Sequence, residues 1–139
     1  MNDTQAPSLP HYLGIAEQKI VLVQDDKSLQ QARLHLMAEA VLGFDTESKP
    51  IFMRGQDSDG PHLVQLATPE WAFLFPVVTS AQVELVRALL KDVLESTNIL
   101  KVGFGLGDDN QRLLNKLGVK VQKVLDLSRA LSTDRKRQM

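Results

Sequence analysis

Hydrophobic residues recur along the chain with two periods, one typical of strands and one typical of helices. The β-branched run from Ile20 to Gln24 favours a strand. The next segment, DDKSLQQARLHLMAEA, predicts a helix because apolar residues follow one another at helical spacing, at Leu29, Ala32, Leu36 and Ala40. Val41 to Glu47 is a second apolar run and predicts a second strand. From about residue 20 onward, the chain is therefore expected to be regularly folded.

The middle of the chain predicts a hairpin followed by a long helix. Leu63 to Ala67 and Trp71 to Pro76 are apolar runs separated only by TPE, which favours two antiparallel strands. Thr79, Ser80 and Gln82 offer a capping-box pattern at a helix start. The helix that follows carries one apolar stripe, which consists of Val83, Val86, Leu89, Leu90, Val93 and Leu94. This stripe is expected to pack on the sheet.

Two more strands are expected near the end, over Ile99 to Phe104 and over Val119 to Leu127. Between them, a short helix is expected to stop at Gly118 and to turn three side chains inward, those of Leu113, Leu114 and Leu117. Strands that first pair locally and then alternate with helices predict an α/β fold, with a mixed sheet flanked by helices.

The second strand ends in two acidic residues of unusual placement. Successive strand side chains point to opposite faces, so Asp45 and Glu47 share one face while Thr46 points away. Two carboxylates held this close repel each other, and either a divalent cation between them or a shared proton relieves the repulsion. Mg²⁺ and Mn²⁺ take oxygen ligands of this kind. The alternative is that water solvates both acids where the strand leaves the sheet.

A glycine-rich turn, GFGLGDD, forms a second candidate site after the fifth apolar run. It places Asp108 and Asp109 at the start of the short helix, where an Asp commonly caps free backbone NH groups. Only one of the two is needed for that role. The spacing G-x-G-x-G does not match the dinucleotide fingerprint, and the sequence has no G-K-[ST] phosphate loop, so no nucleotide cofactor is expected.

Composition narrows the remaining possibilities. The 139 residues suit one domain, and the net charge of -1 gives no bulk attraction to nucleic acid, so any such site must be local. The sequence has no cysteine, which leaves oxygen and histidine as metal ligands.

Residues 1–17 are expected to form a flexible leader and residues 18–139 a single domain. No apolar run is long enough for a membrane span, so a cytoplasmic or nuclear protein without membrane partners is expected.

Three segments resemble a known family. GFDTES, HLVQLAT and ILKVGFGLGDDNQRLLN, in this order and spacing, resemble the DEDD superfamily of 3'-5' exonucleases, in the branch of ribonuclease D and the Werner-syndrome exonuclease domain. The resemblance runs from about Ile20 to the end of the sequence. It implies a ribonuclease H-like fold, C-terminally incomplete because the family's C-terminal helices are missing.

The resemblance also implies an activity and a site. The activity is hydrolysis of phosphodiester bonds from the 3' end of single-stranded DNA or RNA, by a mechanism with two Mg²⁺ or Mn²⁺ ions. Asp45, Glu47 and Asp109 would be the catalytic residues and metal ligands, with Asp109 favoured over Asp108 by the register of the leucine pair. The substrate would contact Thr46, Phe52 and Gly105. Gln65 resembles a polar residue that the family buries beside the site, although a core hydrogen bond is the preferred interpretation of its role.

The family's third motif, a Tyr or His four residues before a fourth acid, has no counterpart after Asp109. The only tyrosine is Tyr12, and the histidines are His11, His35 and His62. Asp126 resembles a family position at the end of the last strand and is interpreted as a helix cap or turn former rather than a metal ligand. The chain itself is therefore expected to bind metal weakly and to turn over slowly or not at all. A catalytically inactive domain that binds nucleic acid or a protein partner is the alternative, and the oligomeric state is left open.

Overall fold

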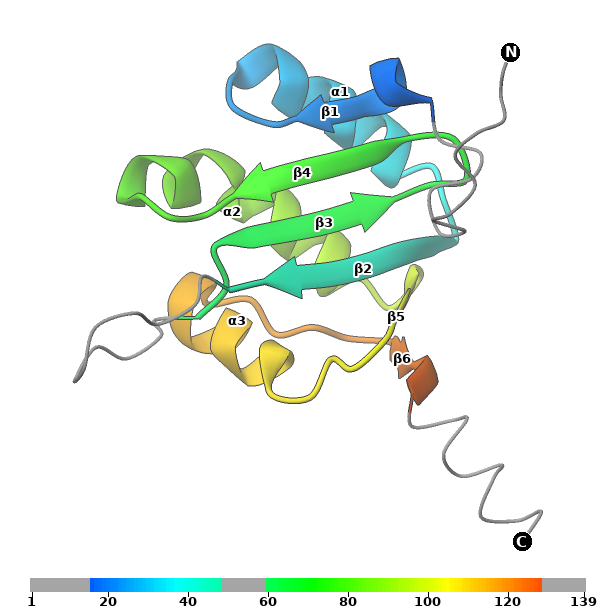
Figure 1. The fold of residues 1–139 in the computed structure, drawn as a ribbon, viewed down its shortest axis with the longest axis vertical. Helices are drawn as coiled ribbons and strands as arrows, with labels where there is room; N and C mark the ends of the chain where they lie inside the picture. Colours follow the sequence, from blue (N-terminus) through cyan, green and yellow to red (C-terminus); the bar gives the residue numbers. More distant parts are fainter. Residues whose placement is uncertain (1–15, 49–59, 129–139) are drawn as a thin grey trace, which may run out of the picture.

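A computed structural model describes residues 16–48 and 60–128 and contains one six-stranded sheet with helices against it (Figure 1). After a short 3-10 helix at Glu17–Lys19, the elements are β1 (Ile20–Leu22), α1 (Asp26–Leu36), β2 (Val41–Glu47), β3 (Leu63–Ala67), β4 (Ala72–Pro76), α2 (Ser80–Leu94), β5 (Leu100–Gly103), α3 (Asp109–Leu117) and β6 (Val124–Asp126). Most of the predicted leader and the predicted substrate contact Phe52 lie outside the described residues.

The sheet is mixed, as the sequence predicts. Its spatial order is β1-β4-β3-β2-β5-β6. β2, β3 and β4 pair as antiparallel neighbours, whereas β1 runs parallel to β4, β5 to β2, and β6 to β5. β2 therefore lies inside the sheet, between β3 and β5. The α/β class with a mixed sheet is confirmed.

Helix ends follow the local signals in the sequence. The predicted capping box at Thr79 and Gln82 begins α2, and a second box begins α1, with the Asp25 carboxylate accepting from the backbone N–H of Ser28. Gly118 ends α3 in the left-handed conformation, at φ 70°, which glycine adopts at little cost.

Two expectations for the last third of the chain are wrong. Leu114 is 39% exposed, because α3 turns only the leucine stripe formed by Leu113 and Leu117 into the core. The last strand is also shorter than Val119 to Leu127, because Lys123 adopts a φ of 53° that extended backbone does not allow, and pairing starts only at Val124.

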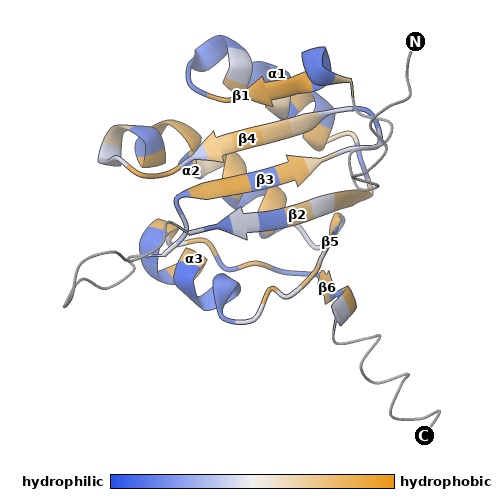
Figure 2. Cartoon of the chain, in the orientation of Figure 1, coloured by the Kyte–Doolittle hydropathy of each residue, from blue (hydrophilic) through white to orange (hydrophobic). Residues whose placement is uncertain are grey.

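The sheet has a covered face and an open face. α1 and α2 lie behind the sheet in Figure 1, and one hydrophobic cluster fills the space between them and the strands. Among the described residues, no helix lies over the other face of the central strands. In Figure 2 the strands β1 and β4 are mainly hydrophobic, β3 is hydrophobic on both sides of a hydrophilic band, and the carboxyl end of β2 is hydrophilic. On the open face, the two acids of β2 and Gln65 of β3 therefore lie among apolar residues of the neighbouring strands.

A buried lysine joins α2 to β5 on the covered face. Lys101 is fully buried, and its ammonium group donates to three carbonyl oxygens, that of Val93 in the last turn of α2 and those of Ser96 and Ile99 in the segment between α2 and β5. Burial lowers the pKa of Lys101 to about 8. The lysine thereby provides a donor to one carbonyl group of the last helical turn and to two in the connection that follows it. No helix in the described part of the chain is long and apolar enough to cross a membrane.

Candidate active site

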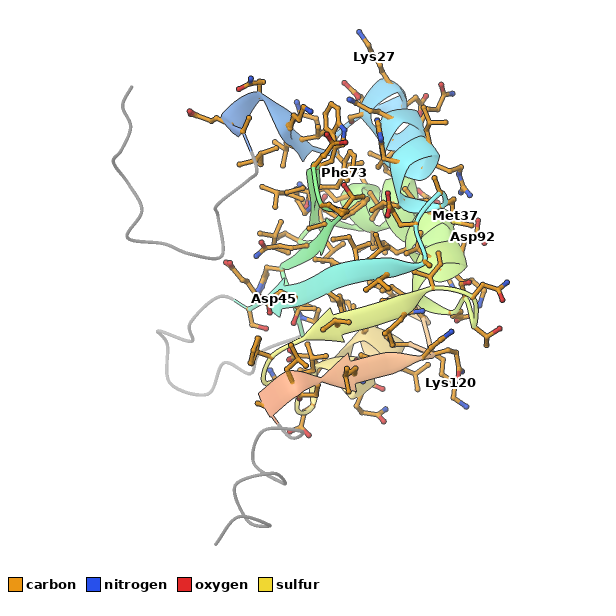
Figure 3. All side chains as sticks on the ribbon, turned by 90° about the vertical axis from the view of Figure 1, so that its right-hand side faces the viewer. Lys27, Met37, Asp45, Phe73, Asp92 and Lys120 are labelled. Atoms are coloured by element: carbon orange, nitrogen blue, oxygen red, sulfur yellow. The ribbon has the colours of Figure 1, made fainter. Side chains whose placement is uncertain are left out.

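The end of β2 presents two carboxylates on the open face of the sheet. Burial alternates along β2, with Leu42 and Phe44 buried under the helices and Asp45 and Glu47 exposed on the opposite side. The half-buried Thr46 points to the covered face, as predicted. Figure 3 places Asp45 at the end of the sheet opposite Met37, Asp92 and Lys120. The pair of acids thus lies at one end of the molecule, where β2 leaves the sheet.

Gln65 lies directly beside this pair. It occupies the position in β3 that faces Asp45 across the ladder, and its side-chain amide donates to Glu47 Oε2 at 2.8 Å. The sequence interpretation of Gln65 as a core hydrogen-bonding residue is therefore wrong, because its partner is an acid of the candidate site. This hydrogen bond orients one of the two oxygens of Glu47.

The glycine-rich turn brings a third acid toward the same end of the sheet. Gly105 and Gly107 have positive φ values, 59° and 39°, which non-glycine residues rarely adopt. The turn ends where the backbone N–H of Asp109 donates to the carbonyl of Leu106 at 2.7 Å, and Asp109 begins α3. Asp108 occupies the N-cap position without a side-chain capping hydrogen bond. The capping role that the sequence allowed is therefore not filled by Asp108.

Close backbone packing sets the start of this turn against β2. A Cβ atom added at Gly103 would collide with the carbonyl oxygen of Phe44, the residue before Asp45. Only glycine allows β5 and β2 to approach this closely. The approach brings the turn after β5 beside the acidic end of β2.

Electrostatics links the three acids. Burial raises the pKa of Asp45 above its ordinary value, and the negative charges of Glu47 and Asp109 raise it further. The hydrogen bond from the backbone N–H of Thr46 to Asp45 Oδ1 acts in the opposite direction. Asp45 is therefore the carboxylate whose pKa both of the other acids raise, and a cation placed beside it would offset this electrostatic repulsion.

Asp126 forms the turn rather than the acidic cluster. Its Oδ1 accepts from the backbone N–H of Gly105 at 3.0 Å and its Oδ2 from that of Leu106 at 2.8 Å. Ser128 adds two more donors to Oδ1, its hydroxyl at 2.7 Å and its backbone N–H at 3.0 Å. These donors hold the pKa of Asp126 at about 2, with the Ser128 hydroxyl as the largest cause. The interpretation of Asp126 as a turn former is confirmed.

The low pKa of Asp126 predicts how acid affects stability. In the unfolded chain the carboxyl titrates near 3.8, so its stabilising contribution is complete above that pH and is lost as the pH falls through about 2. Asp126→Asn is therefore expected to lower the unfolding midpoint at neutral pH, and the difference from the wild type should shrink between pH 4 and 2. Urea titrations at several pH values measure this. A difference that stays constant down to pH 2 would contradict it.

Of the predicted substrate contacts, the structure describes Thr46 and Gly105. The backbone N–H of Gly105 already donates to Asp126 and also to the Ser128 hydroxyl, so it is not available to a ligand. A Cβ atom at Gly105 would meet nothing within 4 Å, which means that the Cα side of this residue faces open space. Contacts of Thr46 and Gly105 with substrate remain predictions.

The oxygen donors of the three acids suit a hard divalent cation, although the three side chains do not lie close together. In residues 16–48 and 60–128, no three acidic or histidine side chains stand close enough to hold a metal ion as they are placed. The donors nevertheless match the oxygen ligands that Mg²⁺ and Mn²⁺ prefer. Two exposed carboxylates lie one residue apart in β2, and a third, at the start of α3, raises the pKa of Asp45 by its charge. Asp45, Glu47 and Asp109 are therefore the residues that would hold such an ion.

A groove on the open face includes two of these acids, Asp45 and Glu47. Its cavity has a volume of about 800 Å³, within the range of small-molecule sites. Asp45, Glu47 and Gln65 contribute its polar groups, and apolar strand residues such as Leu63, Ala67 and Leu74 form the rest of its wall. The groove therefore offers an apolar surface next to a polar, negatively charged end.

The contact between Gln65 and Glu47 predicts the effect of removing it. Gln65→Ala is expected to weaken Mn²⁺ binding by about tenfold, because partners that orient a metal ligand typically contribute that much. Titration of the protein with Mn²⁺, followed by the loss of the free-ion signal, measures the affinity. Gln111→Ala, on the exposed side of α3, is the matched control. Unchanged affinity in folded Gln65→Ala would show that Glu47 needs no such support.

Comparisons with known proteins agree with this arrangement. A family model described as 3'-5' exonuclease matches residues 20–137. Among solved structures, the chain resembles the EXO domain of Nibbler from Aedes aegypti, with a TM-score of 0.72, 25% identity, and coverage of 90% of this chain and 60% of that domain. A search of curated proteins gives no match.

Two further structures were determined with ligands. Ribonuclease D from Trypanosoma brucei, in complex with GMP, matches with a TM-score of 0.67 and 25% identity, over 79% of this chain and 34% of that one. An EXD2 exonuclease domain soaked in Mn and GMP matches with a TM-score of 0.63 and 29% identity, over 87% of this chain and 62% of that one. This chain thus spans less than two thirds of each of these three structures.

The expected fold is confirmed by these neighbours, since the mixed sheet flanked by helices matches ribonuclease H-like exonucleases of the DEDD superfamily. The family match covers most of the chain and includes both β2, with its acidic pair, and the glycine-rich turn before α3. The chain belongs to the 3'-5' exonuclease family.

Proposed function

We propose that this protein is a metal-dependent nuclease that removes nucleotides from the 3' end of single-stranded DNA or RNA. The observation that supports the proposal most directly is that the negative charges of Glu47 and Asp109 both act on Asp45 at the end of β2. Membership of the 3'-5' exonuclease family supports the reaction class, and similar domains soaked in Mn and GMP support the type of cofactor and ligand.

The three acids have different parts in this proposal. Asp45, whose pKa is raised by the charges of both other acids, would hold both ions. Glu47, oriented by Gln65, would hold the ion on the side of the attacking water, and Asp109 would hold the ion on the leaving-group side. Two divalent cations about 3.5 to 4 Å apart activate a water and stabilise the leaving 3' oxygen in such sites. Cations placed beside Asp45 would offset the repulsion that Glu47 and Asp109 exert on it and would favour a closer approach of the three carboxylates.

The substrate is proposed to lie along the groove of the open face. Its apolar wall suits the faces of nucleobases, which bind without regard to sequence, and its acidic end would receive the terminal phosphodiester through the cations. Phe52 and Gly105 are proposed additional contacts, and Thr46 would contribute only through its backbone, because its side chain points to the covered face. Little base specificity is expected, because no residue of this set reads base edges by a bidentate contact.

A binding domain without catalysis is the second candidate. It is favoured by one observation, namely that the described residues hold no group of three acids close enough for a metal ion as placed. Such a domain would retain the fold and the groove and would bind a single strand or a protein partner there. Metal separates the two candidates, because a binding domain should hold single strands equally well with Mn²⁺ or with a chelator.

The experiment uses 5'-labelled single-stranded oligonucleotides, DNA and RNA in parallel, with Mn²⁺ or with a chelator. A ladder that shortens from the 3' end only in the presence of Mn²⁺ supports the nuclease. Binding without cleavage, equal in both conditions, overturns it in favour of the binding domain. Fragments of internal cleavage would contradict the expected polarity.

A further inference from the structure

The carboxylate of Asp126 stands at the junction of two chain segments that the fold brings together. β6 pairs with β5 so that Asp126 faces Gly103, the residue at which the glycine-rich turn leaves the sheet. Four hydrogen bonds converge on the Asp126 carboxylate, two from the turn and two from Ser128. A carboxylate that accepts this many donors is strongly held in one orientation.

The two turn donors are consecutive backbone N–H groups, at Gly105 and Leu106. Because Gly105 is left-handed, the two N–H groups point to the same side and form a concave site for an anion. In a protein that acts on phosphates, such a site would be expected to bind substrate. Here the Asp126 carboxylate fills it, with one oxygen on each N–H group. The anion site of the turn is therefore occupied by a carboxylate of the same chain.

The turn determines where Asp109 stands. Leu106 is buried, its N–H is held by Asp126, and its carbonyl accepts from the N–H of Asp109 at 2.7 Å. Only Gly107 and Asp108 separate Leu106 from Asp109, so the conformation fixed at Leu106 passes directly to the first residue of α3. The N-cap side chain of Asp108 makes no hydrogen bond that would fix the helix start by itself.

We propose that Asp126 is a positioning residue for the active site: by holding the N–H groups of Gly105 and Leu106, it keeps the turn in the conformation that presents Asp109 to Asp45. Asp126 touches neither metal nor substrate in this account. The consequence for metal binding rests on the proposed function, whereas the holding of the turn does not. Ser128 supports the same conformation, because its hydroxyl both donates to Asp126 and accepts from the N–H of Gly105.

The test compares the wild type with Asp126→Asn by two independent measurements. Amide hydrogen exchange at Gly105, Leu106 and Asp109 reports on the turn without metal, and an Mn²⁺ titration reports on the site. In folded Asp126→Asn, exchange at these amides is expected to accelerate by at least about tenfold and the Kd for Mn²⁺ to rise by about tenfold. Asp26→Asn, in the first turn of α1, removes an equal charge and should change neither quantity.

Ser128→Ala serves as the second variant and decides the question if Asp126→Asn does not fold. It removes the bridging hydroxyl but keeps the carboxylate, so smaller changes in the same direction are expected. Wild-type exchange or wild-type Mn²⁺ affinity in a folded Asp126→Asn protein would each overturn the inference. If the wild type itself binds no Mn²⁺, the proposed function fails instead, and the exchange measurement alone decides whether Asp126 holds the turn.

Discussion

Asp45→Asn is expected to reduce metal-dependent cleavage by at least about a thousandfold, or to the level of a chelator-treated sample, because the ions of such a site contribute several kcal/mol to the transition state. Asp45 is the acid whose charge is opposed by both others, and amide nitrogen cannot replace a carboxylate oxygen as a bridge between two cations. The rate of shortening of a labelled oligonucleotide in Mn²⁺ measures the effect.

Stability provides the check on this result. Asp45 is exposed and its hydrogen bond is local, to the N–H of the next residue, so Asp45→Asn should fold like the wild type or be slightly more stable. Circular dichroism and a urea titration establish that. Asp26→Asn should keep full activity. If Asp45→Asn retained activity within about tenfold of the wild type, the acid at this position would not be part of the catalytic site.

Gly103→Ala is expected to lower the free energy of unfolding by about 3 kcal/mol, at the upper end of what inserting an atom into a packed site costs. The added Cβ atom would collide with the carbonyl oxygen of Phe44. A backbone atom within a sheet cannot move away as the end of a flexible side chain can. β5 and β2 would separate next to Asp45, so the variant should lose metal-dependent activity as well. Urea unfolding measures the first effect, and the rate of oligonucleotide shortening in Mn²⁺ measures the second.

Gly43→Ala is the matched control in the same pair of strands. There the nearest atom to an added Cβ is the Cβ of Ala67 at 3.7 Å, which is an ordinary contact. Replacing Gly43 is therefore expected to leave the free energy of unfolding unchanged or to raise it by up to about 1 kcal/mol. Equal destabilisation by both variants would show that the loss at Gly103 does not come from the approach to Phe44.

Short-range patterns in the sequence predict most of the elements because their causes are local. The alternation along β2 requires only that Leu42 and Phe44 be buried, and it then places Asp45 and Glu47 on the opposite face. The capping box at Thr79 lies within four residues and is formed as predicted. The position of Asp109 at the head of α3 also follows from local signals, the glycine turn before it and the leucine pair after it.

Long-range partners could not be predicted in this way. The contact of Gln65 with Glu47 spans 18 residues and depends on the register of β2 and β3, which the sequence does not state. The partners of Asp126 in the glycine-rich turn lie 20 and 21 residues away, so the sequence indicated a turn former without showing which turn. The exposure of Leu114 is not predicted either, because a run of two leucines does not say which of them the helix turns toward the core.

The most direct test of the account is the position at which a divalent cation binds. Amide signals of the isotopically labelled protein would be followed while Mn²⁺ is added in small amounts, since this ion broadens the signals of nuclei near it. The account predicts that the signals of Asp45, Glu47 and Asp109 broaden first and together, and that Asp45→Asn abolishes the effect. Broadening that begins at other acids, such as Asp25 and Asp26, and spares the end of β2 would contradict it.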